Sequence, residues 1–141
     1  LYVSWARRRQ SPMSVGLLDI DNFKQLNDTQ GHQAGDVALV HLASVIRSVL
    51  RPQDSVARYG GEEFLLILPD TLAAGGITVM NRLQAELSRR TAAHNGHALP
   101  LTFSAGVAQL DLDEDAASAI QRADAAMYQA KRQGKNQVIS A

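Results

Sequence analysis

The sequence predicts an α+β fold in which one mixed, mostly antiparallel sheet is packed against helices. Two observations predict it. Short apolar runs alternate with segments of helical apolar spacing in the order β-α-α-β-β-α-β-α-β. Gly60 and Gly61 separate two adjacent apolar runs, which is a hairpin signal. With 141 residues and 45% hydrophobic content, the chain can form one domain with a substantial core.

The first part of the chain contains one strand and two helices. Val15–Ile20 (VGLLDI) is a short apolar run that ends among carboxylates, which is typical of a buried strand. Asp21 is placed to cap a short helix that follows. Residues 28–36 (DTQGHQAGD) have the composition of a turn. Residues 37–50 carry apolar side chains on most faces, so we expect a largely buried helix there.

The second part begins with the hairpin. Pro52 in RPQD ends the long helix, and Ser55–Tyr59 and Phe64–Leu68 form the two strands. The remaining elements are a helix through Ile77, Met80, Leu83 and Leu87, a strand from Leu101 to Leu110, a helix from Ala116 to Ala130 that Gly134 can cap, and an edge strand at 138–140. A hairpin among alternating helices and strands indicates a ferredoxin-like palm in one domain, residues 1–141.

Composition excludes several classes of function. Lys+Arg and Asp+Glu both number 14, so the formal net charge is zero, which argues against a domain that holds nucleic acid by bulk charge. No apolar run is long enough to span a membrane, so we expect this domain to make no direct membrane contact. The absence of cysteine excludes disulfides and thiolate metal sites.

The first ten residues, LYVSWARRRQ, resemble the end of a helix already under way. We therefore expect the chain to be a fragment of a longer protein. Arg7, Arg8 and Arg9 fit a solvated helix end better than a membrane or nucleic-acid patch.

Carboxylates gather at two places where a core strand reaches the surface. Asp19 and Asp21 alternate with Ile20, so the two acids point one way and Ile20 offers only its backbone carbonyl. If Asp21 caps the next helix and the hairpin lies beside this strand, Asp19 and Glu62 converge with no cationic partner nearby in sequence. These acids are either ordinary strand-end and turn residues or ligands of a hard cation, for which Mg²⁺ with phosphates is the usual case.

Four segments together resemble a known family. RYGGEEF (58–64), LLDIDNFKQLND (17–28), GHQAGD (31–36) and ADAAMYQAKRQGKN (123–136) are similar, in the same order, to the motifs of the GGDEF-domain diguanylate cyclases. The third position of the motif is Glu62, a variant that active members of the family use. The resemblance implies the palm fold of nucleotidyl cyclases and the condensation of two GTP molecules into cyclic di-GMP and two pyrophosphates.

The resemblance also implies a metal site. Mg²⁺, with Mn²⁺ as an alternative, is expected on Asp19, the Ile20 carbonyl and Glu62, with Glu63 close by. Glu62 is in addition the family's candidate base, although proton acceptance and metal ligation compete for one carboxylate. Of these two roles, we assign metal ligation to Glu62 first.

Further residues match the nucleotide contacts of the family. Asn27 and Asp36 match the guanine readers, Lys131 and Lys135 the basic phosphate contacts, and Lys135 is more often arginine there. The complete set implied for the substrate is Phe23, Lys24, Asn27, His32, Asp36, Gly60, Gly61, Lys131 and Lys135. Taken alone, Asn27 fits a turn, the two lysines fit a helix C-terminus, and His94 and His97 fit loop polarity.

Arg51 and Asp54 stand just before the glycine motif as an RxxD sequence. This placement resembles the family's inhibitory site for its product, and Arg82 is the best-placed second arginine. The local alternative is a loop in which Arg51 favours the helix C-terminus and Asp54 starts a turn.

The resemblance therefore predicts a homodimeric, Mg²⁺-dependent enzyme with GTP as substrate and cyclic di-GMP as product and inhibitor. The cytoplasm is the expected location, with a parent protein that can be membrane-anchored. The alternative is a catalytically silent module that binds GTP or cyclic di-GMP. A polymerase-like palm is disfavoured by the neutral charge and the lack of an aromatic and basic surface.

Overall fold

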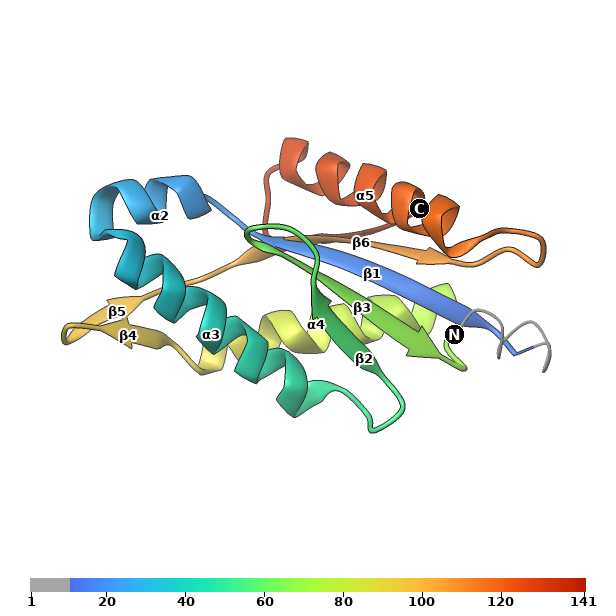
Figure 1. Cartoon of the computed structure of the whole chain (residues 1–141), viewed down its shortest axis with the longest axis horizontal. Coiled ribbons are helices and arrows are strands. Elements are labelled where there is room, and N and C mark those ends of the chain that lie inside the picture. Colours follow the sequence, from blue (N-terminus) through green and yellow to red (C-terminus); the bar gives the residue numbers. More distant parts are fainter. Residues whose placement is uncertain (1–10) are drawn as a thin grey trace.

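A computed structural model describes residues 11–141, and the arrangement of its elements is shown in Figure 1. The five-stranded sheet has the order β2-β3-β1-β6-β7. Its strands are β1 (Met13–Ile20), β2 (Ser55–Arg58), β3 (Glu63–Pro69), β6 (Phe103–Gln109) and β7 (Val138–Ser140). All neighbouring pairs are antiparallel except β6 and β7, which are parallel. The predicted mixed, mostly antiparallel sheet is confirmed; the helix end expected at residues 1–10 lies outside the described part.

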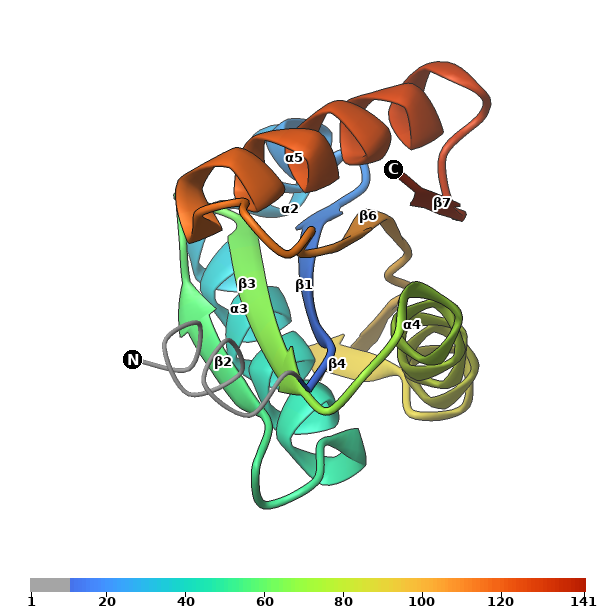
Figure 2. The same cartoon turned by 90° about the vertical axis from the view of Figure 1, so that its right-hand side faces the viewer.

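Helices cover both faces of this sheet. They are α2 (Phe23–Gln30), α3 (His32–Val49), α4 (Ala73–Arg89) and α5 (Ala116–Arg132). Figure 2 shows α5 on one face, with α3 and α4 on the other. Among residues 11–141, no helix combines the length and the apolar character needed to cross a membrane.

The central strand β1 supplies both cores because its side chains alternate between the two faces. Leu18 and Ile20 pack in the larger cluster with α3 and α4. Val15 and Leu17 pack in a second cluster with α5. All eight residues of β1 are buried, which explains why its apolar run could be recognised as a strand.

Helix α5 lies unusually close to β6 because of one glycine. A Cβ atom on Gly106 would stand 2.0 Å from the Ala123 carbonyl oxygen and 2.5 Å from the Met127 nitrogen. Gly106 therefore lets the helix backbone approach the strand directly. Gly134, predicted as the helix cap, follows the C-cap residue Gln133 with φ of 120°.

Two predictions about the first part of the chain were wrong. Helix α3 begins at His32 rather than at residue 37, so GHQAGD is mostly helical and Gly31, with φ of 94°, alone separates α2 from α3. Asp21 is not the N-cap of α2. That position belongs to Asn22, which adopts a left-handed conformation and makes no side-chain capping bond.

A short hairpin between α4 and β6 was not predicted. It consists of β4 (Ala92–His94) and β5 (His97–Leu99), and its turn residues Asn95 and Gly96 both have positive φ. This is the backbone that an Asn-Gly turn adopts between two strands. His94 and His97, expected in a loop, are direct partners across it.

Candidate active site

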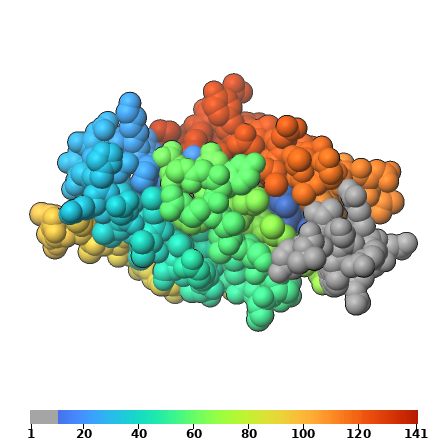
Figure 3. Space-filling view, in the orientation of Figure 1, coloured from blue at the N-terminus to red at the C-terminus, as the bar shows by residue number. Residues whose placement is uncertain are grey.

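The turn of the β2–β3 hairpin lies beside the end of β1. Asp19 is the direct cross-strand partner of Glu63 in the antiparallel pairing of β1 and β3. The Tyr59 amide donates to the Glu63 carbonyl at 2.9 Å and closes the turn around the two glycines. Figure 3 shows the turn region in green at the centre of one face, between the blue α2 region and the orange-red α5. The structure thus brings Asp19 and the GGEEF acids together.

Asp19 is a buried carboxylate with an incomplete set of partners. Its side chain is 11% exposed, and its Oδ1 atom has no hydrogen-bond partner within residues 11–141. The pKa of Asp19 is raised to about 6, chiefly by burial and in addition by the charges of Glu62 and Glu63, while Lys131 opposes the rise. A buried carboxylate oxygen that has an ion pair but no hydrogen bond can still accept a further ligand.

Glu63 has a similar environment. Burial raises its pKa, Asp124 and Glu62 add to this rise, and Lys131 counteracts it. The charge of Glu62 therefore contributes to the raised pKa of both Asp19 and Glu63, and the Lys131 ammonium opposes both shifts. Such repulsion at the surface end of a strand is typical of a site that holds a cation.

Asp21 is the hub of a hydrogen-bond network rather than a helix cap. Its Oδ2 atom accepts from the Thr102 hydroxyl at 2.7 Å and from the Asn136 amide at 3.0 Å. Its Oδ1 atom accepts from the Ser104 hydroxyl at 2.6 Å and from Lys131 Nζ at 3.2 Å. Because four donors fill this carboxylate, Asp21 joins the ends of β1, β6 and α5 instead of presenting a free oxygen.

The two predicted phosphate-contact lysines reach this strand end from α5 and the loop after it. Lys131 Nζ donates to the Ile20 carbonyl at 3.4 Å and pairs with Asp19 Oδ1 at 3.3 Å. Lys135 Nζ donates to the side-chain oxygen of Asn22. Both ammonium groups therefore lie at the junction of β1 and α2, where the resemblance places the triphosphate.

The residues present fit a hard cation. The three predicted ligands, Asp19, the Ile20 carbonyl and Glu62, all offer oxygen, which is the ligand type of Mg²⁺ and Mn²⁺. The unpartnered Oδ1 of Asp19 is available to such an ion. Within residues 11–141, no three His, Cys, Asp or Glu side chains already form a metal cluster, so a cation here would depend on the backbone carbonyl and on bound phosphate as well.

Helix α2 begins directly at this site. Phe23, its first residue, is half-buried and packs its side chain against the larger core. Lys24 is exposed beside it. The free N–H groups of the first turn carry a partial positive charge that favours anions.

The predicted guanine readers lie where α2 meets α3. Asn27 packs against Gly35, where a Cβ atom would stand only 1.9 Å from Asn27 Oδ1. This Oδ1 atom is buried and has no hydrogen-bond partner in the part of the chain that the structure describes. Asp36, the next residue after Gly35, is exposed, and so is His32 at the start of α3. The lack of a side chain at Gly35 thus permits the close approach of Asn27 to the helix that carries Asp36.

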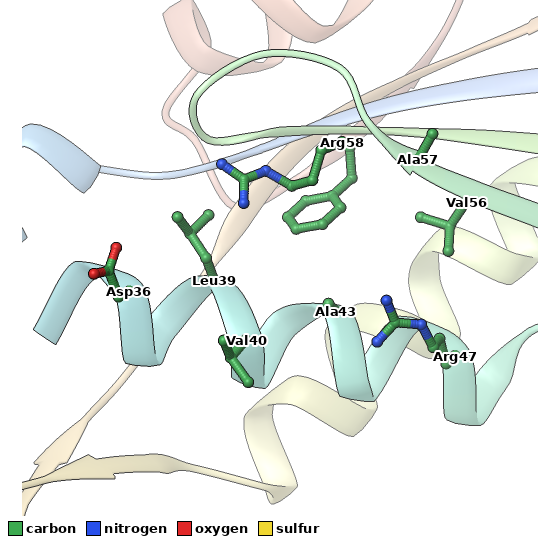
Figure 4. A pocket seen from close by; sticks show the side chains of 9 residues that line it. Asp36, Leu39, Val40, Ala43, Arg47, Val56, Ala57 and Arg58 are labelled. Atoms are coloured by element: carbon green, nitrogen blue, oxygen red, sulfur yellow. The ribbon is translucent and has the colours of Figure 1, made fainter. Parts of the chain in front are cut away.

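Asp36 also lines a cavity of about 360 Å³ between α3 and β2. Figure 4 shows Asp36 at one end of this cavity and Arg47 at the other, with the Arg58 guanidinium above Leu39. Arg58 donates to the Gly61 carbonyl and lies over the Phe64 ring, 5.6 Å from its centroid. The sequence assigned no role to Arg58, although its position one residue before Tyr59-Gly60-Gly61 places a cation at the hairpin turn.

Arg51 and Asp54 form a closed pair at the far end of the hairpin. The guanidinium bonds both Asp54 oxygens, with Nε to Oδ2 at 3.1 Å and NH2 to Oδ1 at 2.8 Å, and also bonds the Pro69 carbonyl and the Thr71 hydroxyl. The Asp54 side chain is 1% exposed, whereas that of Arg51 is 42% exposed. Arg82 is exposed on α4, and no hydrogen bond or ion pair among the described residues joins it to this pair. The structure therefore brings two of the three predicted residues together.

Relatives of known name match most of the chain. The family model "Diguanylate cyclase, GGDEF domain" matches residues 2–137. Diguanylate cyclase A of Treponema denticola is 39% identical over 131 residues, which are 92% of this chain and 35% of that protein. Response regulator PleD of Caulobacter vibrioides is 41% identical over 131 residues, which are 91% of this chain and 29% of that protein. The chain thus spans about a third of the length of these relatives.

Solved structures agree with these matches. The GGDEF domain of DgcB from Caulobacter crescentus, in complex with cyclic di-GMP, superposes with a TM-score of 0.93 at 37% identity, over 99% of this chain and 83% of that one. The active GGEEF domain of a diguanylate cyclase from Vibrio cholerae superposes with a TM-score of 0.90 at 32% identity, over 99% and 88% of the two chains. Motifs, fold and relatives lead to one assignment: this chain belongs to the GGDEF-domain family of diguanylate cyclases.

Proposed function

We propose that the domain condenses two GTP molecules into cyclic di-GMP and releases two pyrophosphates. The observation that carries the proposal is the buried Oδ1 of Asp19, which has an ion pair with Lys131 but no hydrogen bond among residues 11–141 and lies near Glu62 and Glu63. Neighbouring carboxylates repel one another, so this concentration of acids stabilises neither a core nor a surface turn. A cation carried in with a triphosphate would neutralise it.

Asp19, the Ile20 carbonyl and Glu62 would hold Mg²⁺ or Mn²⁺. When bound, the ion would supply positive charge that favours a triphosphate and lowers the pKa of the attacking 3′-hydroxyl. Glu62 is assigned first to ligation. Glu63 follows Glu62 directly in the chain and would be a second acid at the site, and burial raises the pKa of its carboxyl group.

The triphosphate would lie against the first turn of α2 and the two lysines. The backbone N–H groups of α2 donate to phosphate oxygens, and Lys131, Lys135 and Lys24 supply positive charge. Lysine at position 135 contributes a point charge rather than the two-pronged contact of arginine. These groups fix the α-phosphate in front of a hydroxyl that belongs to the other substrate molecule.

Asn27 and Asp36 would read the base. A carboxylate that accepts from the N1–H and the exocyclic amine of guanine leaves adenine without the matching donors, so ATP binding would leave polar groups unpaired. The buried, unpartnered Oδ1 of Asn27 supports this role because it is an acceptor awaiting a donor. His32 would lie near the nucleotide at the start of α3.

The glycine pair supports close contact between ligand and hairpin. Neither Gly60 nor Gly61 has a left-handed φ, and a Cβ atom on Gly61 would meet nothing within 4 Å. The fold alone therefore places no demand for glycine at position 61. A nucleotide lying directly on the turn would supply one, because a side chain there would occupy its place.

Each chain carries one set of nucleotide motifs, whereas the product is a symmetric ring closed by two identical bonds. We therefore propose that two copies face each other across a two-fold axis, so that each 3′-hydroxyl meets the α-phosphate bound by the partner. Since GTP is a cytoplasmic nucleotide, the cytoplasm is the proposed location of the domain.

The test is incubation of the purified domain with GTP and Mg²⁺, followed by chromatographic detection of cyclic di-GMP. Specific activity should rise with protein concentration in the range where the dimer dissociates. Tight binding of GTP without product, at concentrations where the dimer is demonstrated, would favour the silent binding module instead. If a demonstrated monomer has a specific activity that does not change with protein concentration, the proposal that two copies face each other is contradicted.

We also propose product inhibition through Arg51 and Asp54, with Arg82 as a second arginine. The complexes of other GGDEF domains with cyclic di-GMP support product binding as a property of the fold. The half-exposed guanidinium of Arg51 is the accessible part of the pair and suits phosphate oxygens or a guanine edge. Asp54 would have to release one of its bonds to Arg51 before it could accept from a guanine N–H.

A further inference from the structure

Lys131 stands at the centre of the proposed cation site. Its Nζ atom lies 3.3 Å from Asp19 Oδ1 and 3.4 Å from the Ile20 carbonyl oxygen, and both of these oxygens are proposed cation ligands. A third oxygen, Oδ1 of Asp21, lies 3.2 Å away. One ammonium group therefore already faces the oxygens that the divalent ion would use.

The three oxygens depend on this ammonium group to different degrees. Asp21 has hydrogen bonds from Thr102, Ser104 and Asn136, so it stays satisfied if Lys131 moves. Among residues 11–141, Asp19 Oδ1 has no hydrogen bond, and Lys131 is the one cationic group that forms an ion pair with it. Loss of the lysine from this position would thus leave Asp19, and not Asp21, in need of another cation.

Lys131 is also able to move. It belongs to the last turn of α5, its side chain is 24% exposed, and lysine has a flexible four-carbon stem. A divalent ion on Asp19 and the Ile20 carbonyl would stand within a few ångströms of the ammonium, and two positive charges at such a separation repel strongly in a partly buried site.

We propose that Lys131 is the resting counter-ion of the cation site and competes with the divalent ion for Asp19 until a triphosphate draws the ammonium away. This proposal rests on the proposed function of the site and adds the condition under which the divalent ion binds there. The bare ion binds weakly, and nucleotide binding removes the competitor. Nucleotide and ion then strengthen each other's binding, and this coupling is reciprocal. A lysine that only contacts phosphate would leave binding of the bare ion unchanged.

The experiment measures Mn²⁺ binding to the nucleotide-free domain by electron paramagnetic resonance, with and without a non-reactive GTP analogue. Four variants are compared with the unsubstituted protein. Lys131→Gln removes the charge, Lys131→Arg keeps it, Lys135→Gln removes a neighbouring ammonium that pairs with Asn22 instead of a carboxylate, and Asp19→Asn removes the proposed ligand. Melting temperatures establish that each variant is folded.

Lys131→Gln is expected to bind bare Mn²⁺ about tenfold more tightly, because the competing positive charge is gone. In the same variant, the GTP analogue is expected to increase the affinity for Mn²⁺ by a smaller factor than in the unsubstituted domain. Lys131→Arg and Lys135→Gln are expected to bind the bare ion as the unsubstituted domain does. Unchanged or weaker binding by Lys131→Gln overturns the proposal, as does an equal gain in Lys131→Arg, since charge would then not be the cause.

The failure of the cation site itself gives a different result. If Asp19→Asn binds Mn²⁺ in the presence of the analogue as tightly as the unsubstituted domain, Asp19 is not a ligand, and both the site and the competition are wrong. Asp19→Asn could instead lose Mn²⁺ binding while Lys131→Gln binds Mn²⁺ no more tightly than the unsubstituted domain in the absence of nucleotide. The cation site would then be supported, and only the counter-ion role of Lys131 would be wrong.

Discussion

Replacing Asp19 by asparagine should stabilise the metal-free domain at neutral and alkaline pH. The carboxylate is 11% exposed, and its Oδ1 atom lacks a hydrogen bond. Its pKa is raised from an ordinary value of 3.8 to about 6, mainly by burial, with Glu62 and Glu63 contributing to the rise and Lys131 opposing it. The folded protein therefore holds the negative charge of Asp19 less readily than the unfolded chain does.

The magnitude and its pH dependence follow from this pKa. A rise from 3.8 to about 6 corresponds to about 3 kcal/mol, because each pKa unit is worth about 1.4 kcal/mol. Since the folded pKa is raised, the contribution of Asp19 to stability is fully present below pH 3.8 and is lost as the pH rises through about 6. Asparagine has no charge to lose. The variant should thus gain up to about 3 kcal/mol over the unsubstituted protein at pH 8 and less than about 1 kcal/mol at pH 4.

Urea unfolding at pH 4 and pH 8 in the presence of EDTA would measure both differences. Asp28→Asn is the matched control, because Asp28 is an exposed acid on nearby α2, and its difference from the unsubstituted domain should stay small at both values. The reasoning is refuted if Asp19→Asn is the less stable protein at pH 8, or if its advantage does not grow between the two pH values. Added Mn²⁺ and analogue should stabilise the unsubstituted domain more than this variant.

Three further substitutions test the proposed roles. Glu62→Gln should reduce cyclic di-GMP formation by about 100-fold or more because it removes a charged ligand while keeping the shape, and an unchanged rate in the folded variant would reject the assignment. Asp36→Ala should weaken GTP binding by about tenfold or more and narrow the preference for GTP over ATP, as measured by calorimetry with both nucleotides. A preference that survives would place guanine reading elsewhere. Arg51→Ala should leave the initial rate largely intact but remove inhibition by micromolar cyclic di-GMP, a micromolar dissociation constant corresponding to about −8 kcal/mol of binding free energy. If that variant is inhibited as strongly as the unsubstituted domain, or if the latter is not inhibited at all, Arg51 is only a loop residue.

Local patterns in the sequence were sufficient for the main elements. The buried strand β1 and the hairpin strands were recognisable because their apolar runs end at charged or glycine-rich segments. The convergence of Asp19 with the GGEEF acids could also be expected, once the hairpin was assumed to lie beside β1. The hairpin does lie beside β1, because Asp19 pairs with Glu63 across β1 and β3.

Other features depend on contacts that no local pattern records. Residues 32–36 appeared to form a turn because they are polar and small, yet Ala34 and Gly35 are buried where α3 meets α2 and the chain continues as a helix. Asp21 looked like a helix cap because it precedes a helix. Its true partners, among them Thr102 and Asn136, are remote in sequence, and only the folded chain brings them to it. The β4–β5 hairpin was missed because three-residue strands are too short to show alternation, although Asn95-Gly96 was a recognisable turn signal.

The network at Asp21 has a consequence for the time at which the site can form. The donors to this carboxylate lie 81, 83, 110 and 115 residues further along the chain. Contacts between residues so far apart in sequence form late in folding, because the entropy cost of closing a long loop precedes the stabilisation that the contact provides. During synthesis, the strand end that carries Asp19 emerges early but cannot be organised until residue 136 has left the ribosome. A nascent or C-terminally truncated chain would therefore contain the nucleotide motifs without an organised site, and the proposed activity would be absent from incomplete protein.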